Sequence, residues 1–152
     1  MDNAIEKPPT HLWIVGGLAL LWNCIGPTDY LMTRLRNDAW IKMGMPDVDP
    51  QIVYNWIDSM PIWSQIGWGL GVWGGLLGSI LLLARSRYAV PTFLVSLVGV
   101  AMSLGWQLVA GPDMPVEMTQ GAAAKIMPLV IIAIAIVLFV YARAMRIRGV
   151  LR

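Results

Sequence analysis

Four long apolar stretches constrain this chain more than any other feature of its sequence. They cover roughly residues 12–32, 62–84, 89–110 and 122–142. The hydrocarbon core of a bilayer is about 30 Å thick, and an α-helix rises about 1.5 Å per residue, so about 20 apolar residues are enough to cross it. Each stretch reaches this length. The pattern predicts an all-α membrane protein, a bundle of four transmembrane helices in which residues 1–152 form one domain.

Composition excludes several classes of function. Hydrophobic residues make up 57% of the chain and charged residues 13%, which is not the balance of a soluble domain. The formal net charge is only +2, and the basic residues lie at the ends of the apolar stretches, so we expect no nucleic-acid partner. His11 is the only histidine and Cys24 the only cysteine. They provide no metal site, haem site, disulfide or nucleophile–base pair, so we expect no cofactor and no enzymatic activity.

The distribution of lysine and arginine predicts the orientation. With four spans, both termini and the turn between the second and third spans share one side. That side carries Lys7, Arg85, Arg87, Arg143, Arg146, Arg148 and Arg152, whereas the other side has fewer basic residues and most of the acidic ones. Because positive residues favour the cytoplasm, we expect a multi-pass plasma-membrane protein with cytoplasmic N- and C-termini. No small-residue cleavage site follows the first stretch, so we expect that stretch to be retained.

Proline and capping residues predict where the helices begin. Ser59 is a candidate N-cap for the second span, with Pro61 in its first turn, and Pro91 opens the third span in the same way. The turn at residues 85–87 between them is short, so these two spans should form an antiparallel hairpin. Pro128 falls in the first or second turn of the fourth span.

The connection over residues 33–59 has helical signals of its own. Asp38 is spaced i,i+4 from both Arg34 and Lys42, so the first helix is predicted to continue past the membrane. Asp49 is then a candidate N-cap, with Pro50 at the first helical position. Apolar side chains after it share one helical face: Ile52, Val53, Trp56, Ile57 and Met60. This segment is either a short interfacial helix that anchors the protein at headgroup depth or a lid over a pocket between the spans.

Small residues predict close helix packing. In the second span they recur every four residues, and the third span carries a counterpart. They are Gly67, Gly71, Gly75 and Ser79 in the second span, with Gly99 and Ser103 in the third. Small residues at this spacing form a groove that lets another helix backbone approach closely. The groove serves either packing within the bundle or a seam between copies of the chain.

Four polar residues near one end of the spans are the candidate site: Asn23, Asp29, Gln65 and Gln107. Asp29 is the only carboxylate within any of the four stretches, and an intramembrane acid is a candidate for function. It either pairs with Arg34 or Arg36 in a structural role, or it binds a proton or a solute. Pro27 between Asn23 and Asp29 predicts a kink.

The chain resembles a known family over roughly Trp13 to Trp106, from the first span to the third, where Phe93-Leu94-Val95-Ser96-Leu97 resembles the start of the family's third span. The first two spans and their borders carry most of the matching runs. They contain Leu21-Trp22-Asn23, Gly26 and Asp29-Tyr30-Leu31-Met32, then Met60-Pro61-Ile62-Trp63 and Gly71-Val72-Trp73-Gly74-Gly75-Leu76-Leu77-Gly78-Ser79. These runs resemble small bacterial four-span membrane proteins of about 150 residues with a WNxxGxxDY first span, which are often labelled sugar transporters without an established activity. The resemblance implies the four-span fold and a bacterial inner membrane.

Two functions remain open from the sequence. One is an oligomeric transporter of a small, sugar-like solute that meets Asn23, Asp29 and Gln107. A dimer would then enlarge the narrow interior of four spans. The other is a non-catalytic accessory or scaffold subunit that docks on a larger membrane complex through the groove at Gly67, Gly71 and Gly75.

Overall fold

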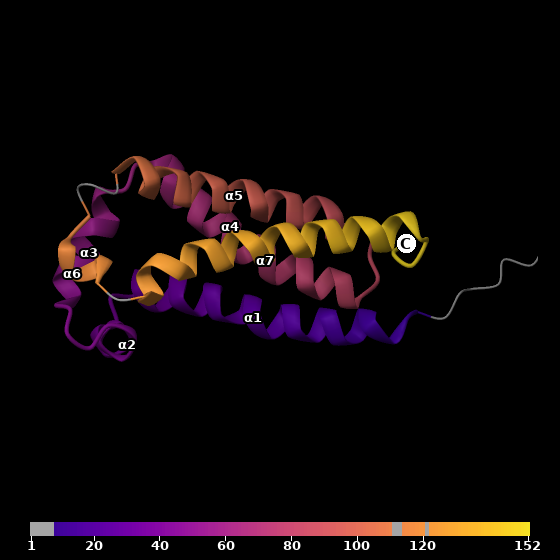
Figure 1. The fold of residues 1–152 in the computed structure, drawn as a ribbon, viewed down its shortest axis with the longest axis horizontal. Coiled ribbons are helices and arrows are strands. Elements are labelled where there is room, and N and C mark those ends of the chain that lie inside the picture. The colour runs from indigo at the N-terminus through magenta and orange to yellow at the C-terminus, as the bar shows by residue number, and fades with distance from the viewer. Residues whose placement is uncertain (1–7, 111–113, 121) are drawn as a thin grey trace, which may run out of the picture.

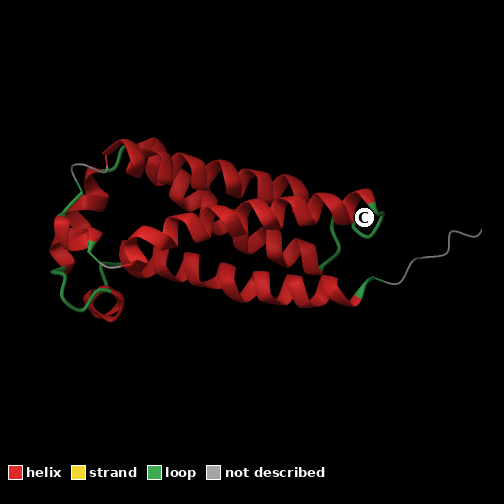
Figure 2. Cartoon of the chain, in the orientation of Figure 1, coloured by secondary structure: helices red, strands yellow, loops and turns green. Residues whose placement is uncertain are grey.

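The computed structural model describes residues 8–110, 114–120 and 122–152, and these residues form helices and loops without any strand. Lys7, which contributed to the predicted charge asymmetry, lies outside them. The helices in the described part are α1 (Thr10–Arg34), α2 (Asp38–Gly44), α3 (Pro50–Ser59), α4 (Ile62–Leu83), α5 (Ala89–Ala110), α6 (Val116–Thr119) and α7 (Ala122–Ile147). The four long helices run along the long axis of the molecule, and α2, α3 and α6 gather at one end (Figures 1 and 2).

Three of the described helices, α4, α5 and α7, are long and apolar enough to cross a membrane. α1 is long enough, with 25 residues, but does not reach the same hydropathy. Asn23, Pro27 and Asp29 lie within it and dilute its apolar residues. The sequence predicted four such helices, and the structure provides three. Hydropathy alone therefore does not identify α1 as a membrane span, and its position is described below from its contacts with α4.

α4 and α5 are packed at backbone distance. α4 lies between α1 and α5, and α7 packs on α5. A Cβ atom added to Gly99 would lie 2.5 Å from the Gly71 amide nitrogen and 2.6 Å from the Gly67 carbonyl oxygen. The Ser96 hydroxyl donates to the Gly71 carbonyl at 2.7 Å. Gly67 and Gly71 of α4 therefore face α5 of the same chain, and the two helices form a tight hairpin.

α1 packs on another face of α4 through a polar side chain. The Asn23 amide donates to Ser79 Oγ at 3.1 Å and to the Ala19 carbonyl at 2.9 Å. Its carbonyl oxygen lies directly over Gly75, where a Cβ atom would clash with it. Ser79 Oγ in turn donates to the Gly75 carbonyl at 2.9 Å. The amide of Asn23 therefore has its hydrogen-bond partners inside the bundle.

The end of the bundle away from α2 and α3 closes around an apolar core, and we call it the sealed end. Its buried residues come from all four long helices and from the C-terminal segment: Leu12, Ala19, Leu82, Ala89, Phe93, Leu138, Ala142, Met145, Val150 and Leu151. The C-terminal segment is held by the α4–α5 turn, because the Arg87 amide donates to the Arg152 carbonyl at 2.7 Å and the Arg152 amide to the Arg85 carbonyl at 2.8 Å. His11 Nδ1 and the Tyr141 hydroxyl, 2.6 Å apart, join α1 to α7.

The predicted continuation of the first helix is wrong. α1 ends at Arg34, Arg36 adopts a positive φ of 52°, and a separate helix, α2, begins at Asp38. The Asn37 side chain caps α2 by accepting from the Trp40 amide at 3.0 Å. Asp38 accepts from the Tyr54 hydroxyl at 2.9 Å and makes no ion pair with the predicted arginine or lysine. An exposed i,i+4 pair contributes only about 0.3–0.5 kcal/mol, so a cap and a tertiary hydrogen bond outweigh it.

One predicted helix start is confirmed and one is wrong. Asp49 caps α3 by accepting from the Gln51 amide at 2.9 Å, and Pro50 takes the first helical position. Ser59 does not cap α4, because its hydroxyl donates back to the Trp56 carbonyl at 2.6 Å. The Ser59 hydroxyl therefore belongs to the last turn of α3, although the sequence predicted it as the cap of α4. Pro61 occupies the N-cap position of α4, which has no side-chain cap.

Candidate functional site

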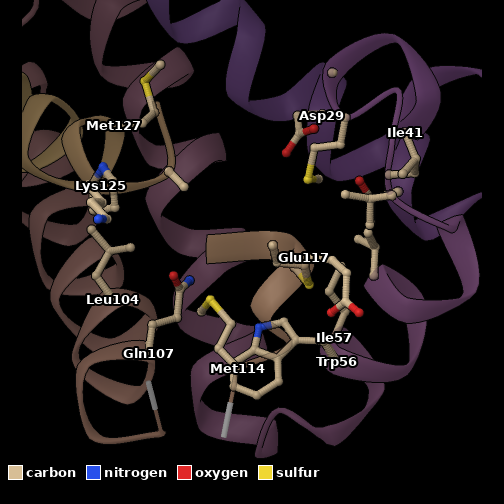
Figure 3. Close-up of a pocket in the computed structure, with 18 of the residues that line it drawn as sticks. Asp29, Ile41, Trp56, Ile57, Leu104, Gln107, Met114, Glu117, Lys125 and Met127 are labelled. Atoms are coloured by element: carbon tan, nitrogen blue, oxygen red, sulfur yellow. The ribbon is translucent and has the colours of Figure 1, made fainter. Parts of the chain in front are cut away.

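A cavity of about 970 Å³ lies at the end opposite the sealed end, and we call this the cavity end. Residues from the long helices form its walls, and α2, α3 and α6 contribute from across the end of the bundle (Figures 1 and 3). α3 presents Val53, Trp56 and Ile57 to it. Trp56 also packs against Trp106 of α5, with ring centroids 4.8 Å apart. The apolar face predicted for the segment after Asp49 thus covers a cavity.

The cavity wall is largely apolar with a few charged groups. Five methionines line it: Met45, Met60, Met114, Met118 and Met127. Asp29 and Glu117 stand on one side of the close-up view, with Gln107 and Lys125 on the other (Figure 3). Asp47 adds a third carboxylate. A large apolar cavity with a few polar groups is the usual form of a small-molecule site.

Asp29 is positioned by the break after α1. Because the chain turns at residues 35–37, α2 folds back beside the last turns of α1. The Trp40 indole Nε1 then donates to Asp29 Oδ1 at 2.9 Å. The side chain of Asp29 is half-buried, and its carboxylate points toward the cavity (Figure 3).

The two arginines predicted to pair with Asp29 are engaged elsewhere. Arg36 forms an ion pair with Asp58 at 2.7 Å. Arg34 donates to Gln65 Oε1 at 2.9 Å, and its guanidinium lies 5.3 Å from the Tyr30 ring centroid and 5.6 Å from that of Trp68. The alternative in which Asp29 pairs with Arg34 or Arg36 is therefore wrong. Its partner is a neutral indole N–H, which local sequence did not indicate because Trp40 lies beyond the break.

The structure brings together two of the four candidate polar residues. Asp29 and Gln107 both line the cavity. Asn23 lies away from it in the α1–α4 contact with Ser79. Gln65 is taken up between Arg34 and the Met60 carbonyl, to which its amide donates at 2.8 Å.

Sequence reasoning missed Lys125 and Glu117 as residues of the site. Lys125 is the only charged residue in the apolar stretch 122–142, and that isolation was the available signal. Glu117 lies in α6, a helix of four residues that carries no periodic pattern. Its approach to the cavity depends on tertiary structure alone.

Tyr54 fastens α3 to α2 beside the cavity. Its side chain is only 2% exposed, and its hydroxyl donates to Asp38 at 2.9 Å. Burial raises the pKa of the Tyr54 phenol, the bond to Asp38 raises it further, and the charge of Arg36 opposes the shift. The Arg36 guanidinium lies 5.2 Å from the Tyr54 ring centroid. These contacts hold the two short helices together under the cavity.

Neither a metal site among the described residues nor a similar known protein identifies the chemistry of this cavity. Within the described residues, no group of three or more histidine, cysteine or acidic side chains is placed to hold a metal ion. Comparison of the chain with protein-family models, with curated proteins and with solved structures finds no match.

Proposed function

We propose that this chain is a four-span bacterial inner-membrane protein that transports a small solute through the cavity. The first support concerns α1 as the fourth span. At about 1.5 Å per residue, its 25 residues extend over about 37 Å, enough to cross the hydrocarbon core beside α4. Ile14, Leu18, Leu21 and Ile25 form an exposed apolar stripe along it, while Asn23 turns inward to α4. This division suits a helix between lipid and protein.

The second support concerns the two ends of the bundle. Six arginines lie at the sealed end, in the α4–α5 turn and after the middle of α7: Arg85, Arg87, Arg143, Arg146, Arg148 and Arg152. The positive-inside rule therefore puts the sealed end and both termini in the cytoplasm and the cavity on the opposite face.

One observation carries the proposal of transport. At the cavity end, the space between the long helices is a cavity with polar groups in its wall, and at the sealed end it is filled by an apolar core. A transporter that alternates its access needs this asymmetry in each of its states, with a binding site reached from one side and a seal toward the other. A cavity of about 970 Å³ within one chain also means that transport does not require a second copy to enlarge the interior.

The accessory-subunit alternative is weaker. Its docking surface was the groove at Gly67, Gly71 and Gly75. In the structure that groove is filled from within, because Gly67 and Gly71 face α5 and Gly75 faces Asn23. A partner would have to displace these contacts.

Cysteine labelling from the two faces of the membrane tests transport. Cys24 is exposed and is first replaced by serine. Ser103→Cys then places a near-isosteric thiol on the cavity wall, at a residue that is only 6% exposed. A membrane-impermeant thiol reagent is added to spheroplasts and, separately, to inverted vesicles. Arg143→Cys at the sealed end reports orientation, and Val137→Cys, 62% exposed on an apolar helix face, reports leakage of the reagent into lipid.

A transporter should give labelling of Ser103→Cys in both preparations, because the cavity is reached from either side in turn. Arg143→Cys should react only in inverted vesicles and Val137→Cys in neither. Labelling of Ser103→Cys in spheroplasts alone would overturn transport and leave a one-sided binding protein.

A further inference from the structure

We propose that the cavity binds organic cations with a bulky apolar body. The proposal rests on the proposed function, since it names the class of solute for the same cavity. Its first support is the charge of the wall. The described lining carries three carboxylates, Asp29, Asp47 and Glu117, against one ammonium group, Lys125, a formal net charge of −2. Low-dielectric walls focus such a field, so a cationic solute is attracted and an anionic one repelled.

Asp29 supplies a carboxylate that no protein cation neutralises in the described part of the chain. Its two nearest candidates, Arg34 and Arg36, are bound to Gln65 and Asp58. The Trp40 indole occupies Oδ1 and fixes the side chain. Oδ2 makes no hydrogen bond to any described residue, and the Asp29 carboxylate as a whole points toward the cavity (Figure 3). Because Trp40 holds the carboxylate in place and both arginines are bound to other residues, Asp29 can pair with a cationic ligand.

The apolar wall of the cavity is the reason to expect a solute with a large apolar part. Trp56 and Trp68 line the cavity, and indole faces attract cations electrostatically. The Arg34 guanidinium lies 5.6 Å from the Trp68 ring centroid, so this ring already makes a cation–π contact within the chain. The methionines of the wall are flexible and polarizable, which lets one cavity fit apolar groups of different shape. The hydroxyl groups of a sugar would find few hydrogen-bond partners on this apolar wall, so the lining favours an amphipathic cation over a sugar.

The size of the cavity agrees with this class. Pockets for drug-sized ligands measure about 300–1,000 Å³, and this cavity of about 970 Å³ lies at the upper end of that range. A metal ion or a small inorganic cation would leave most of the volume to water. A multi-ring organic cation is large enough to fill more of it.

Two ions of nearly the same shape and opposite charge test the proposal. The full chain is purified in mild detergent and dialysed to equilibrium against tetraphenylphosphonium or tetraphenylborate. We expect saturable binding of the cation and at least tenfold weaker binding of the anion. Equal binding of the two would overturn the proposal, because the cavity would then select for apolar volume and not for charge.

Matched variants locate the binding in the cavity. Asp29→Asn keeps an oxygen to accept from Trp40 and removes only the charge, so cation binding should weaken about tenfold. Asp49→Asn makes the same change outside the cavity, at a cap that asparagine also fills, and should leave binding unchanged. Lys125→Gln should tighten cation binding, since it removes the one positive charge of the described lining.

Circular dichroism of each variant shows whether the fold is kept. Unchanged binding in folded Asp29→Asn and Lys125→Gln would also overturn the proposal. The result is separable from the labelling test. Two-sided labelling without cation selectivity would leave a transporter of another solute class, whereas cation binding with one-sided labelling would leave a binding protein.

Discussion

Replacing Gly99 with alanine should separate the two central helices. The new methyl group would meet backbone atoms, the nearest being the Gly71 amide nitrogen at 2.5 Å, about 0.9 Å inside ordinary contact at 3.4 Å. Backbone cannot rotate away as a side chain can, so α4 and α5 must move apart. Overpacking of this kind costs about 1–3 kcal/mol. Loosening the bond from Ser96 to the Gly71 carbonyl adds roughly 0.6 kcal/mol, a typical value between membrane helices. The expected loss is about 2–4 kcal/mol.

Gly105→Ala provides the matched control on the same helix. Nothing lies within 4 Å of a Cβ atom at Gly105, so this change should be neutral or stabilising by up to about 1 kcal/mol. Both variants are unfolded reversibly by sodium dodecyl sulfate in mixed micelles, followed by circular dichroism and by the fluorescence of the eight tryptophans. Equal unfolding free energies for Gly99→Ala and Gly105→Ala would refute close backbone packing as the basis of the hairpin.

Two further predictions concern the ends of the bundle. Leu151 is 5% exposed in the sealed end, so Leu151→Asp should destabilise the fold by about 3 kcal/mol or more and make the C-terminal segment sensitive to protease, whereas exposed Ile147→Asp should not. Because the folded state raises the pKa of Tyr54 above the usual value of about 10, its stabilisation is complete below that pH and is lost as pH rises through the raised value. Thermal unfolding between neutral and strongly alkaline pH should show this loss, and Tyr54→Phe should reduce it.

Helix ends were predictable where adjacent residues decide the outcome. Asp49 and Pro50 fix the start of α3 by their own chemistry, and the structure places that start at Pro50. Prediction failed where partners distant in sequence compete. Asp38 has suitable partners four residues away on both sides, yet it binds the hydroxyl of Tyr54. The hydroxyl of Ser59 serves the preceding helix instead of the following one.

The sequence predicted some residues of the candidate site but not others. Of the predicted residues, Asp29 and Gln107 line the cavity, whereas Asn23 and Gln65 do not. Asn23 and Asp29 are six residues apart, which places them about a third of a turn from each other around α1. The packing of α1 on Gly75 sets which of them faces the cavity, and that contact turns Asn23 toward α4. Glu117 and Lys125 reach the cavity from segments far along the chain. Such juxtapositions follow from helix rotation and tertiary packing, which residue type and spacing do not specify.

The contact between Asn23 and Ser79 has a consequence for the biogenesis of the protein. In the four-span arrangement proposed above, α1 leaves the ribosome before α4, although it is the least apolar of the long helices. The hydroxyl that accepts from its half-buried Asn23 amide lies on α4 and exists only after that later span has been made. A lone α1 would therefore keep only the bond from the Asn23 amide to the Ala19 carbonyl, and the second N–H of the amide would lack a partner in lipid. The helix that carries Asn23 is thus made before the helix that supplies its hydroxyl partner.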